Sequence, residues 1–409
     1  MSKQRWIVLF VFLSMLLFAL PLACDDDDDD DDDDDNDTTT DDDDDNDNDD
    51  NDDDDNDDDN NDTAADDDDD DDDDTVLPEG CIAGDFSVYF GMLHSHSAFS
   101  DGRGTPRTAY EHARDEGDLD VFALTDHLEL LYLPIPPDKW ERLHDIADEF
   151  YEPGSYVSLV GFEYSSAFDL PTFVSSGHIN VFFSDEMFPI IMLDYHYFYE
   201  LLLQCPDCLA QFNHPGYGGQ TNWDNFEYDP DMDSQINQIE LSTWHLDAWP
   251  FLFEALDKGW RLSPTWNQDN HDGGWGTEDD HRTGLWLSDL TRESVRDCLR
   301  DRRTFSTLDK NASLRFQTAE GCWMGSDLSG TTLATLLVEA VDPDEGDGFA
   351  SLELWGNGEQ LLLDFDCAGN QICELEDTLT LSGAGDYVLV RAVQEDGDLL
   401  VSAPIWFGP

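Results

Sequence analysis

Residues 90–102 read FGMLHSHSAFSDG, and the rest of the chain is best interpreted outward from this stretch. The apolar run from Val88 to Leu93 is typical of a short buried strand, and a loop rich in turn residues follows it. Residues two apart on an extended chain point the same way, so His94 and His96 can direct both imidazoles at one point. Imidazole nitrogen is a good ligand for Zn, Mn or Fe, and Asp101 adds a carboxylate nearby. The stretch therefore predicts part of a metal site, with two surface histidines in a loop as the alternative.

Strand and helix signals alternate from here to about residue 312. Thr105-Pro106 is typical of a helix start, and Gly117 follows the end of that helix. This alternation favours an α/β domain with a mostly parallel sheet. Polar side chains recur at the strand ends, which is where barrel enzymes carry their active sites. Further strands are predicted over 119–124, 156–162, 178–183, 208–212, 236–241, 262–268 and 283–287, and further helices over 140–150, 247–258 and 292–302.

Six short motifs contain these polar residues, and in this order they resemble the motifs of the PHP (polymerase and histidinol phosphatase) metallohydrolases. The resemblance covers residues 88 to 310. A Gly-His-x-Asn-Val step at 177–181, Arg303-Thr304-Phe305 and an appended β-rich part are most similar to the carbaryl-hydrolase-like branch of that family. One departure from the family pattern is Asn270, where a smaller residue is commoner; it lies between two motif residues and is not itself a ligand. The motifs are His94-x-His96 with Ser100-Asp101-Gly102, Thr125-Asp126-His127, Gly161-Phe162-Glu163, Gly177-His178, Asn213-His214-Pro215 and Asp269-x-His271.

The resemblance implies a distorted seven-stranded barrel that holds two or three divalent metal ions, with Zn, Mn or Fe as candidates. It also gives catalytic roles to Asp269, as acceptor of the proton of the attacking water, and to Glu163, which two ions would share. Taken singly, each of these residues could be an ordinary loop histidine or strand-end carboxylate. The implied ligands are His94, His96, Glu163 and Asp269 for the first ion, Glu163, His178 and His214 for the second, and Asp101, His127 and His271 for the third.

Such a site predicts hydrolysis. Cations a few Å apart lower the pKa of water towards neutrality, withdraw charge from a phosphoester, or polarise the carbonyl of an ester or carbamate. We expect a metal-dependent hydrolase whose leading substrate class is a phosphoester, with carbamate or carboxyl esters as the alternative. An alternative of another class is a binding module that keeps its metals for structure. Arg103 is a candidate phosphate clamp, and His245 is a candidate contact at the rim of the pocket.

The first residues have the form of an export signal. Two basic residues precede an apolar run from Trp6 to Leu20, which is too short for a comfortable membrane span. Residues 21–24 resemble a bacterial lipoprotein processing site, so residues 1–24 are expected to be a signal peptide with a lipid on Cys24. Pro21 stands where that motif prefers Leu, so cleavage by signal peptidase I is one alternative. An uncleaved anchor is the other. We expect an exported protein of the bacterial cell envelope, periplasmic or at the cell surface, that touches a membrane only through its lipid.

The acidic composition restricts the partners. Residues 25–74 contain 37 Asp and no Lys or Arg, which predicts a disordered linker over 25–78 that acts as a spacer, with a weak Ca²⁺ sponge as the alternative. The remainder, 75–409, carries 60 acidic residues against 16 Lys and Arg, a net charge of −44. This field opposes nucleic acids and anionic membrane surfaces. We therefore expect a small-molecule substrate and no nucleic-acid partner.

The sequence changes character near residue 312. The metallohydrolase domain is expected over 79–312, and short strand-type runs separated by turn residues predict a small β-sandwich-like domain over 313–409. Its expected role is to cover the open side of the barrel, with carbohydrate or partner binding as the alternative. Seven cysteines follow Cys24 and fit an oxidising compartment. Residues 367 and 373, and residues 205 and 208, are candidate disulfide pairs, and the odd number leaves at least one thiol unpaired or paired unexpectedly.

Overall fold

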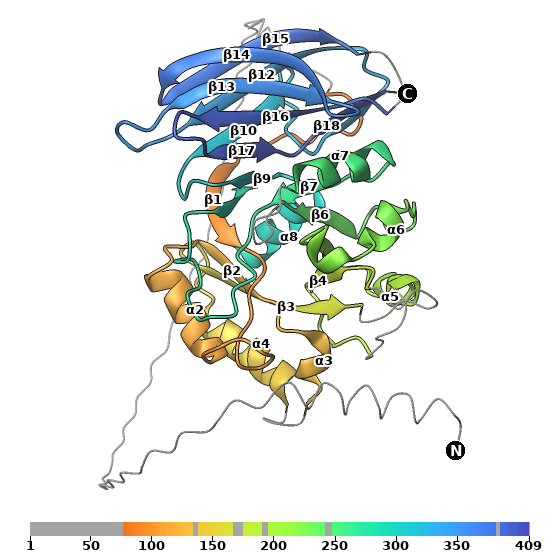
Figure 1. Ribbon diagram of the computed structural model, residues 1–409, viewed down its shortest axis with the longest axis vertical. Helices are drawn as coiled ribbons and strands as arrows, with labels where there is room; N and C mark the ends of the chain where they lie inside the picture. Colours follow the sequence, from red (N-terminus) through yellow and green to blue (C-terminus); the bar gives the residue numbers. More distant parts are fainter. Residues whose placement is uncertain are drawn as a thin grey trace, which may run out of the picture. The chain divides into compact units, whose positions relative to one another are not determined.

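The computed structural model describes residues 77–133, 138–166, 175–189, 195–241, 248–381 and 385–408 (Figure 1). The described residues all belong to one compact unit. The expected signal peptide with Cys24 and nearly all of the Asp-rich segment lie outside the described residues, and so does His245. Among the helices of the described ranges, none combines the length and the apolar character needed to cross a bilayer.

The first nine strands form a curled sheet in the order β9-β8-β1-β2-β3-β4-β5-β6-β7 (Figure 1). Strands β1 to β3 pair in parallel and so do β5 to β7, whereas β4 and β8 are antiparallel to both neighbours. The sheet curls until β7 lies against β9, where Thr304 Oγ1 is 2.8 Å from Ser263 Oγ and 3.0 Å from the Pro264 carbonyl oxygen. The strands are β1 (Ser87–Met92), β2 (Val121–Leu124), β3 (Val157–Ser165), β4 (His178–Phe182), β5 (Leu209–Asn213), β6 (Ile236–Glu240), β7 (Ser263–Thr265), β8 (Arg282–Leu287) and β9 (Thr304–Thr307).

The sheet is therefore mixed, where the sequence predicted a mostly parallel one. The departure that matters for the site is β4. No helix signal stands between Glu163 and His178 in the sequence, and an antiparallel neighbour needs no crossover helix. The sequence predicted that this strand ends at residue 162, directly before Glu163. Strand β3 instead continues through Glu163 to Ser165.

Helices pack on the sheet through apolar side chains. Tyr110 of α2 and Leu143 of α4 are buried in one core with Phe122 of β2, while Leu299 of α8 is buried in another core with Val121 of the same strand. The side chains of successive residues of β2 thus point to opposite faces of the sheet, as expected for an extended backbone. The predicted cap of α2 is confirmed, because the Thr105 hydroxyl accepts a hydrogen bond from the Thr108 amide. The helices are α2 (Pro106–Asp115), α3 (Leu128–Leu131), α4 (Lys139–Phe150), α5 (Tyr195–Leu202), α6 (Asn222–Phe226), α7 (Trp249–Asp257) and α8 (Arg292–Arg300), with a 3₁₀ turn η1 (Tyr217–Gly219).

Strands alone follow from Ser313 onward in the described part of the chain. Strands β10, β12 and β15 form a second sheet, whereas the others join the large sheet because β17 pairs with β9. Apolar side chains such as Val338 of β12 and Leu354 of β13 fill the space between the two sheets. Since the large sheet continues past residue 312, the division into two domains and the sandwich both stay predictions. The strands are β10 (Ser313–Thr318), β11 (Asp327–Ser329), β12 (Leu333–Val341), β13 (Phe349–Gly356), β14 (Gln360–Asn370), β15 (Ile372–Thr380), β16 (Tyr387–Gln394), β17 (Leu399–Ser402) and β18 (Ile405–Gly408).

Three disulfides link described cysteines. The predicted pairs Cys205–Cys208 and Cys367–Cys373 are confirmed, and a third bond joins Cys81 to Cys322. The remaining thiol, Cys298, is fully buried on α8, and burial raises its pKa to about 12. The predicted odd thiol is thus an inert core residue.

Candidate metal centre

Residues at the ends of strands meet at one edge of the curled sheet. The carboxyl ends of β1, β2, β3, β5, β6 and β7 lie there, and β4 presents its first residue because it runs the other way. The register places His178 opposite both Ser165 and Asn213. The structure brings all nine predicted ligands to this edge: His94, His96 and Asp101 after β1, His127 after β2, Glu163 on β3, His178 on β4, His214 after β5, and Asp269 and His271 after β7.

A first group consists of His94, His96, Glu163 and Asp269. The Nε2 atoms of the two histidines lie 3.3 Å apart, and Asp269 Oδ1 is 3.2 Å from the first and 2.9 Å from the second. Glu163 Oε1 lies 3.3 Å from His94 Nε2. Both histidines are fully buried, and Glu163 is 1% exposed.

A second group shares the same carboxylate. Glu163 Oε1 lies 3.0 Å from His178 Nδ1 and 3.2 Å from His214 Nε2. The Asn213 side-chain amide donates to the same oxygen at 3.0 Å. Glu163 therefore stands between the first and second groups, which is the position expected of a carboxylate that bridges two cations.

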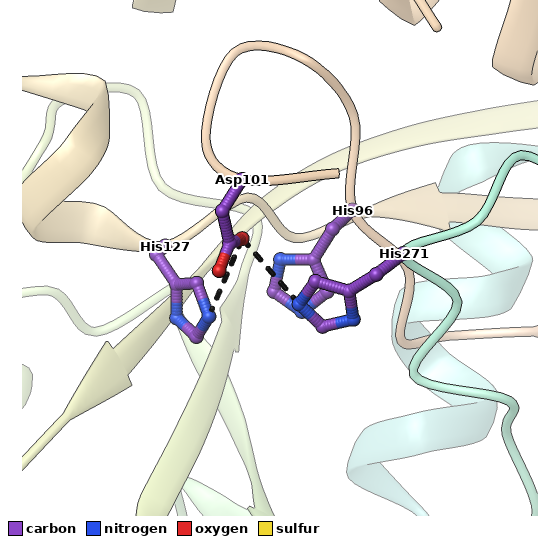
Figure 2. A group of neighbouring side chains, drawn as sticks. All are labelled: His96, Asp101, His127 and His271. Atoms are coloured by element: carbon purple, nitrogen blue, oxygen red, sulfur yellow. Dashed lines mark ion pairs between the residues drawn. The ribbon is translucent and has the colours of Figure 1, made fainter. Parts of the chain in front are cut away.

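A third group is drawn in Figure 2. It contains Asp101, His127 and His271, as predicted, and also His96, which the sequence had placed only in the first group. Asp101 Oδ1 lies 3.7 Å from His127 Nε2 and 3.4 Å from His271 Nε2. The rings of His96 and His271 stack with centroids 4.0 Å apart. His127 turns its other nitrogen, Nδ1, to Glu163 Oε2 at 2.9 Å, so the third group adjoins the first.

The short distances between these carboxylates and imidazoles strongly affect the pKa values of both. Burial favours a neutral Glu163, but His178, His94 and His127 outweigh it and hold the pKa of that carboxyl well below its usual range. Burial likewise opposes protonation of His94 and His127, yet Asp269 and Glu163 raise the pKa of His94 well above its usual value, and Glu163 raises that of His127 to about 10. Burial, with His127 beside it, lowers the pKa of His96 to about 4.

The donor set fits divalent cations. No Lys or Arg of the described ranges forms an ion pair with the nine residues, so six imidazoles and three carboxylates face one another. His214 Nδ1 is a buried atom without a hydrogen-bond partner in the described structure. His214 and Asp269 also have positive φ angles, of 30° and 46°, which are uncommon for residues with a Cβ. A cluster of nitrogen and oxygen donors of this kind is what Zn, Mn or Fe requires.

Glu240, at the end of β6, is a site residue that the sequence reasoning did not single out. Its carboxylate lies 3.2 Å from His94 Nδ1 and accepts hydrogen bonds from the Asn267 side chain at 3.0 Å and the His214 amide at 2.8 Å. A histidine that binds a metal through one nitrogen is usually oriented by such a partner on the other. The available signal was a carboxylate at the end of a predicted buried strand.

Asp126 organises the loop that carries Asp101. Its buried carboxylate accepts hydrogen bonds from the backbone amides of Ser97 and Ser100 at 2.8 and 3.1 Å, and from the Ser97 hydroxyl at 2.7 Å. Trp275 is buried and donates from Nε1 to the His96 carbonyl at 2.9 Å. These contacts fix the backbone around the ligands.

The two residues proposed to touch substrate fare differently. The Arg103 side chain is 77% exposed and lies 3.4 Å from Asp272, so it is not drawn towards the nine ligands. His245 falls outside the described residues. The Arg103 side chain therefore has no contact in the described structure that argues for substrate binding.

Similarity to known proteins is distant. A family model described as a protein of unknown function (DUF3604) matches residues 125–194, and no curated protein matches the chain. A solved two-domain protein from Bacteroides vulgatus, which contains a predicted PHP-like metal-dependent phosphoesterase, is 18% identical over 80% of this chain and 97% of its own, with a TM-score of 0.44. The lesion-specific endonuclease PfuEndoQ from Pyrococcus furiosus is 17% identical over 52% of this chain and 56% of its own, with a TM-score of 0.36. The assignment of a function therefore rests on the site.

Proposed function

We propose that this chain is a metal-dependent hydrolase that acts on a small phosphoester through a metal-activated water. The observation that carries the proposal is the convergence of nine donor residues, one of which is the buried carboxylate Glu163 that two of the groups share. We infer two or three divalent ions, of Zn, Mn or Fe, in the three groups. When bound, such ions lower the pKa of water and draw charge from the oxygens of a substrate.

The geometry distinguishes the roles of the two candidate catalytic carboxylates. Glu163 is enclosed by imidazoles and is 1% exposed, so it suits a bridging ligand that holds the groups together. The Asp269 side chain is 17% exposed, so of the two carboxylates it is the one that water can reach. Asp269 is therefore the better candidate to accept a proton from an attacking water.

A phosphoester leads because several cations in one site complement an anionic phosphoryl group better than a neutral acyl group. Carbamate and carboxyl esters are the second candidate class, and they need fewer charges at the reacting centre. Nucleic acid is disfavoured by the net charge of −44 over residues 75–409. A metal-containing binding module without catalysis is the candidate of another class.

The test is turnover by the metal-loaded full chain on four substrates: p-nitrophenyl phosphate, p-nitrophenyl acetate, an aryl carbamate and a single-stranded oligonucleotide. We expect p-nitrophenyl phosphate to be hydrolysed. Glu163→Gln should remove turnover and lower metal content, because it breaks the carboxylate shared by the groups. Asp269→Asn should lower kcat by roughly 10²–10⁴-fold, the usual range for losing a general base, and can also weaken metal binding.

Glu141→Gln, on the exposed side of α4, is the matched control and should change neither quantity. Full metal content in Glu163→Gln would contradict the site. Bound metal without turnover of any substrate would favour the binding module. Turnover of the acetate or carbamate alone would select the second substrate class, and cleavage of the oligonucleotide would overturn the small-molecule assignment.

The proposal also includes the type of barrel and the cellular location of the protein. The order of the motifs supports a seven-stranded PHP-type barrel of the carbaryl-hydrolase-like branch, with a β-sandwich domain over 313–409. The signal-type sequence of residues 1–24 supports export and a lipid on Cys24. Three disulfides in the described part of the chain fit the oxidising cell envelope.

A further inference from the structure

Three acidic side chains meet at a second place, where the loops of the C-terminal strands converge. Asp309 follows β9, Asp342 follows β12 and Asp347 precedes β13. One carboxylate oxygen from each lies within 4.8 Å of the others. Asp309 and Asp342 are 8% and 2% exposed, so water screens their charges poorly.

None of the Lys, Arg or His side chains in the described ranges forms an ion pair with the three residues. The nearby guanidinium of Arg282 donates its hydrogen bonds to backbone carbonyls. Backbone amides supply part of the compensation, since Asp309 Oδ1 accepts from Asn311 and Ala312 at 2.8 Å each. Partial dipoles of this kind do not neutralise two buried carboxylates.

An independent feature points to a ligand between them. Gln394, the last residue of β16, is 1% exposed, and its Nε2 donates to Asp342 Oδ2 at 2.6 Å. The amide group therefore lies against the acidic cluster. Its Oε1 is buried and has no donor in the described structure. A buried amide oxygen is normally satisfied, so an unpartnered one beside carboxylates suggests a missing positive partner.

We propose that Asp309, Asp342, Asp347 and the Gln394 side-chain oxygen form a Ca²⁺ site that fastens the β9–β10, β12–β13 and β16–β17 connections together. All four donors are oxygens, which suits a hard cation and not the Zn-type ion of the His-rich centre. Ca²⁺ tolerates irregular geometry and completes six to eight ligands with water or carbonyls, whereas Mg²⁺ demands a near-ideal octahedron. The site shares no residue with the proposed hydrolase centre, so the two proposals stand or fall separately.

The test is thermal unfolding of the full chain, loaded with a fixed amount of Zn²⁺, with and without 10 mM CaCl₂ as an example of a saturating dose. For a dissociation constant of roughly 0.1–1 mM, Ca²⁺ should raise the Tm by about 2–5 °C. Asp347→Asn should abolish this rise, and its calcium-free Tm should not fall, because the substitution removes one of the repelling charges. Glu345→Gln, an exposed neutralisation two residues away, is the matched control and should keep the full response.

Residues 25–74 are the same in every variant, so calcium bound by their aspartates cancels in the comparison. Asp347→Ser offers a second replacement in case the Asn variant folds poorly. A calcium response retained by both variants would overturn the proposal. An equal Tm rise with MgCl₂ in the unmodified chain would overturn it too, because the rise would then reflect screening of an acidic surface.

Discussion

Glu240 belongs to the candidate metal centre although its carboxylate does not face the proposed metal positions. It approaches the nitrogen of His94 that points away from Glu163 and Asp269, and it also accepts from the His214 amide. One buried carboxylate thus sets the ring orientation of a residue from the first group and the backbone of a residue from the second. The orientation of each imidazole ring determines whether the nitrogen lone pairs of neighbouring histidines point at a common metal position.

We expect Glu240→Gln to weaken metal binding by about 10–100-fold, the usual cost of losing such a partner. The new amide nitrogen would face donors from Asn267 or His214, so stability should also fall by about 1–3 kcal/mol. Chelator competition at fixed pH measures the affinity, and denaturant unfolding measures the stability. Glu186→Gln, at an exposed position, serves as the control. An affinity equal to that of the unmodified chain would show that His94 needs no orienting partner.

Some residues of this candidate centre could be identified from the sequence and others could not, and the reason lies in the chemistry of each residue. His94 and His96 stand out because residues two apart on an extended segment can direct both imidazoles at one point. Glu240 ends an unremarkable Asn-Gln-Ile-Glu run, and its role depends on the ring of His94, which lies 146 residues earlier in the chain. The second membership of His96 likewise depends on the stacked ring of His271, which only the folded chain reveals.

At the scale of elements, the segment from Ser97 to Asp101 behaves as one unit held by Asp126. This carboxylate accepts from two backbone amides and from hydroxyls of the same loop, and Asp101 follows directly. The loop is therefore anchored to the segment that follows β2, and His127, the residue after Asp126, belongs to the same group as Asp101. The hydrogen bonds that hold the loop therefore also hold Asp101 close to His127.

Asp126→Asn tests this coupling, because an amide replaces one of the two accepting oxygens with a donor. We expect stability to fall by about 1–3 kcal/mol and the third group to lose its ion while the first two keep theirs. Elemental analysis after gel filtration measures stoichiometry, and thermal unfolding measures stability. Asp145→Asn, exposed on α4, should behave like the unmodified chain. Unchanged stoichiometry together with unchanged Tm would refute the anchoring role.

The sequence alone was sufficient to predict some helices and strands, but not others. Strands β5 and β6 and helix α2 were predictable within a residue or two, because apolar runs and caps act locally. The direction of β4 was not, since it depends on which neighbours it pairs with and not on its own residues. That direction matters, because it puts His178 at the start of its strand and still at the edge where the others end.

At the scale of the whole molecule, the start of the described chain is fastened to its C-terminal strands. Ile82 donates to Ser326 Oγ at 2.9 Å and accepts from the Trp323 amide at 2.8 Å, beside the Cys81–Cys322 disulfide. Residues 81 and 82 therefore pack with the strands that follow residue 312, although they precede β1. The covalent link spans a sequence separation of 241 residues, whereas Cys367–Cys373 spans 6.

This difference predicts unequal costs for the two bonds. In the chain-entropy account, closing the longer loop stabilises the fold by about 5 kcal/mol and closing the shorter one by about 2 kcal/mol. The paired variants Cys81→Ser/Cys322→Ser and Cys367→Ser/Cys373→Ser are matched in chemistry, and Cys322, Cys367 and Cys373 are all buried. Denaturant unfolding should give the first pair the larger loss of stability. Equal losses would mean that the Ile82 and Trp323 contacts already hold the two parts together, so that the disulfide adds little to a connection made by packing and hydrogen bonds.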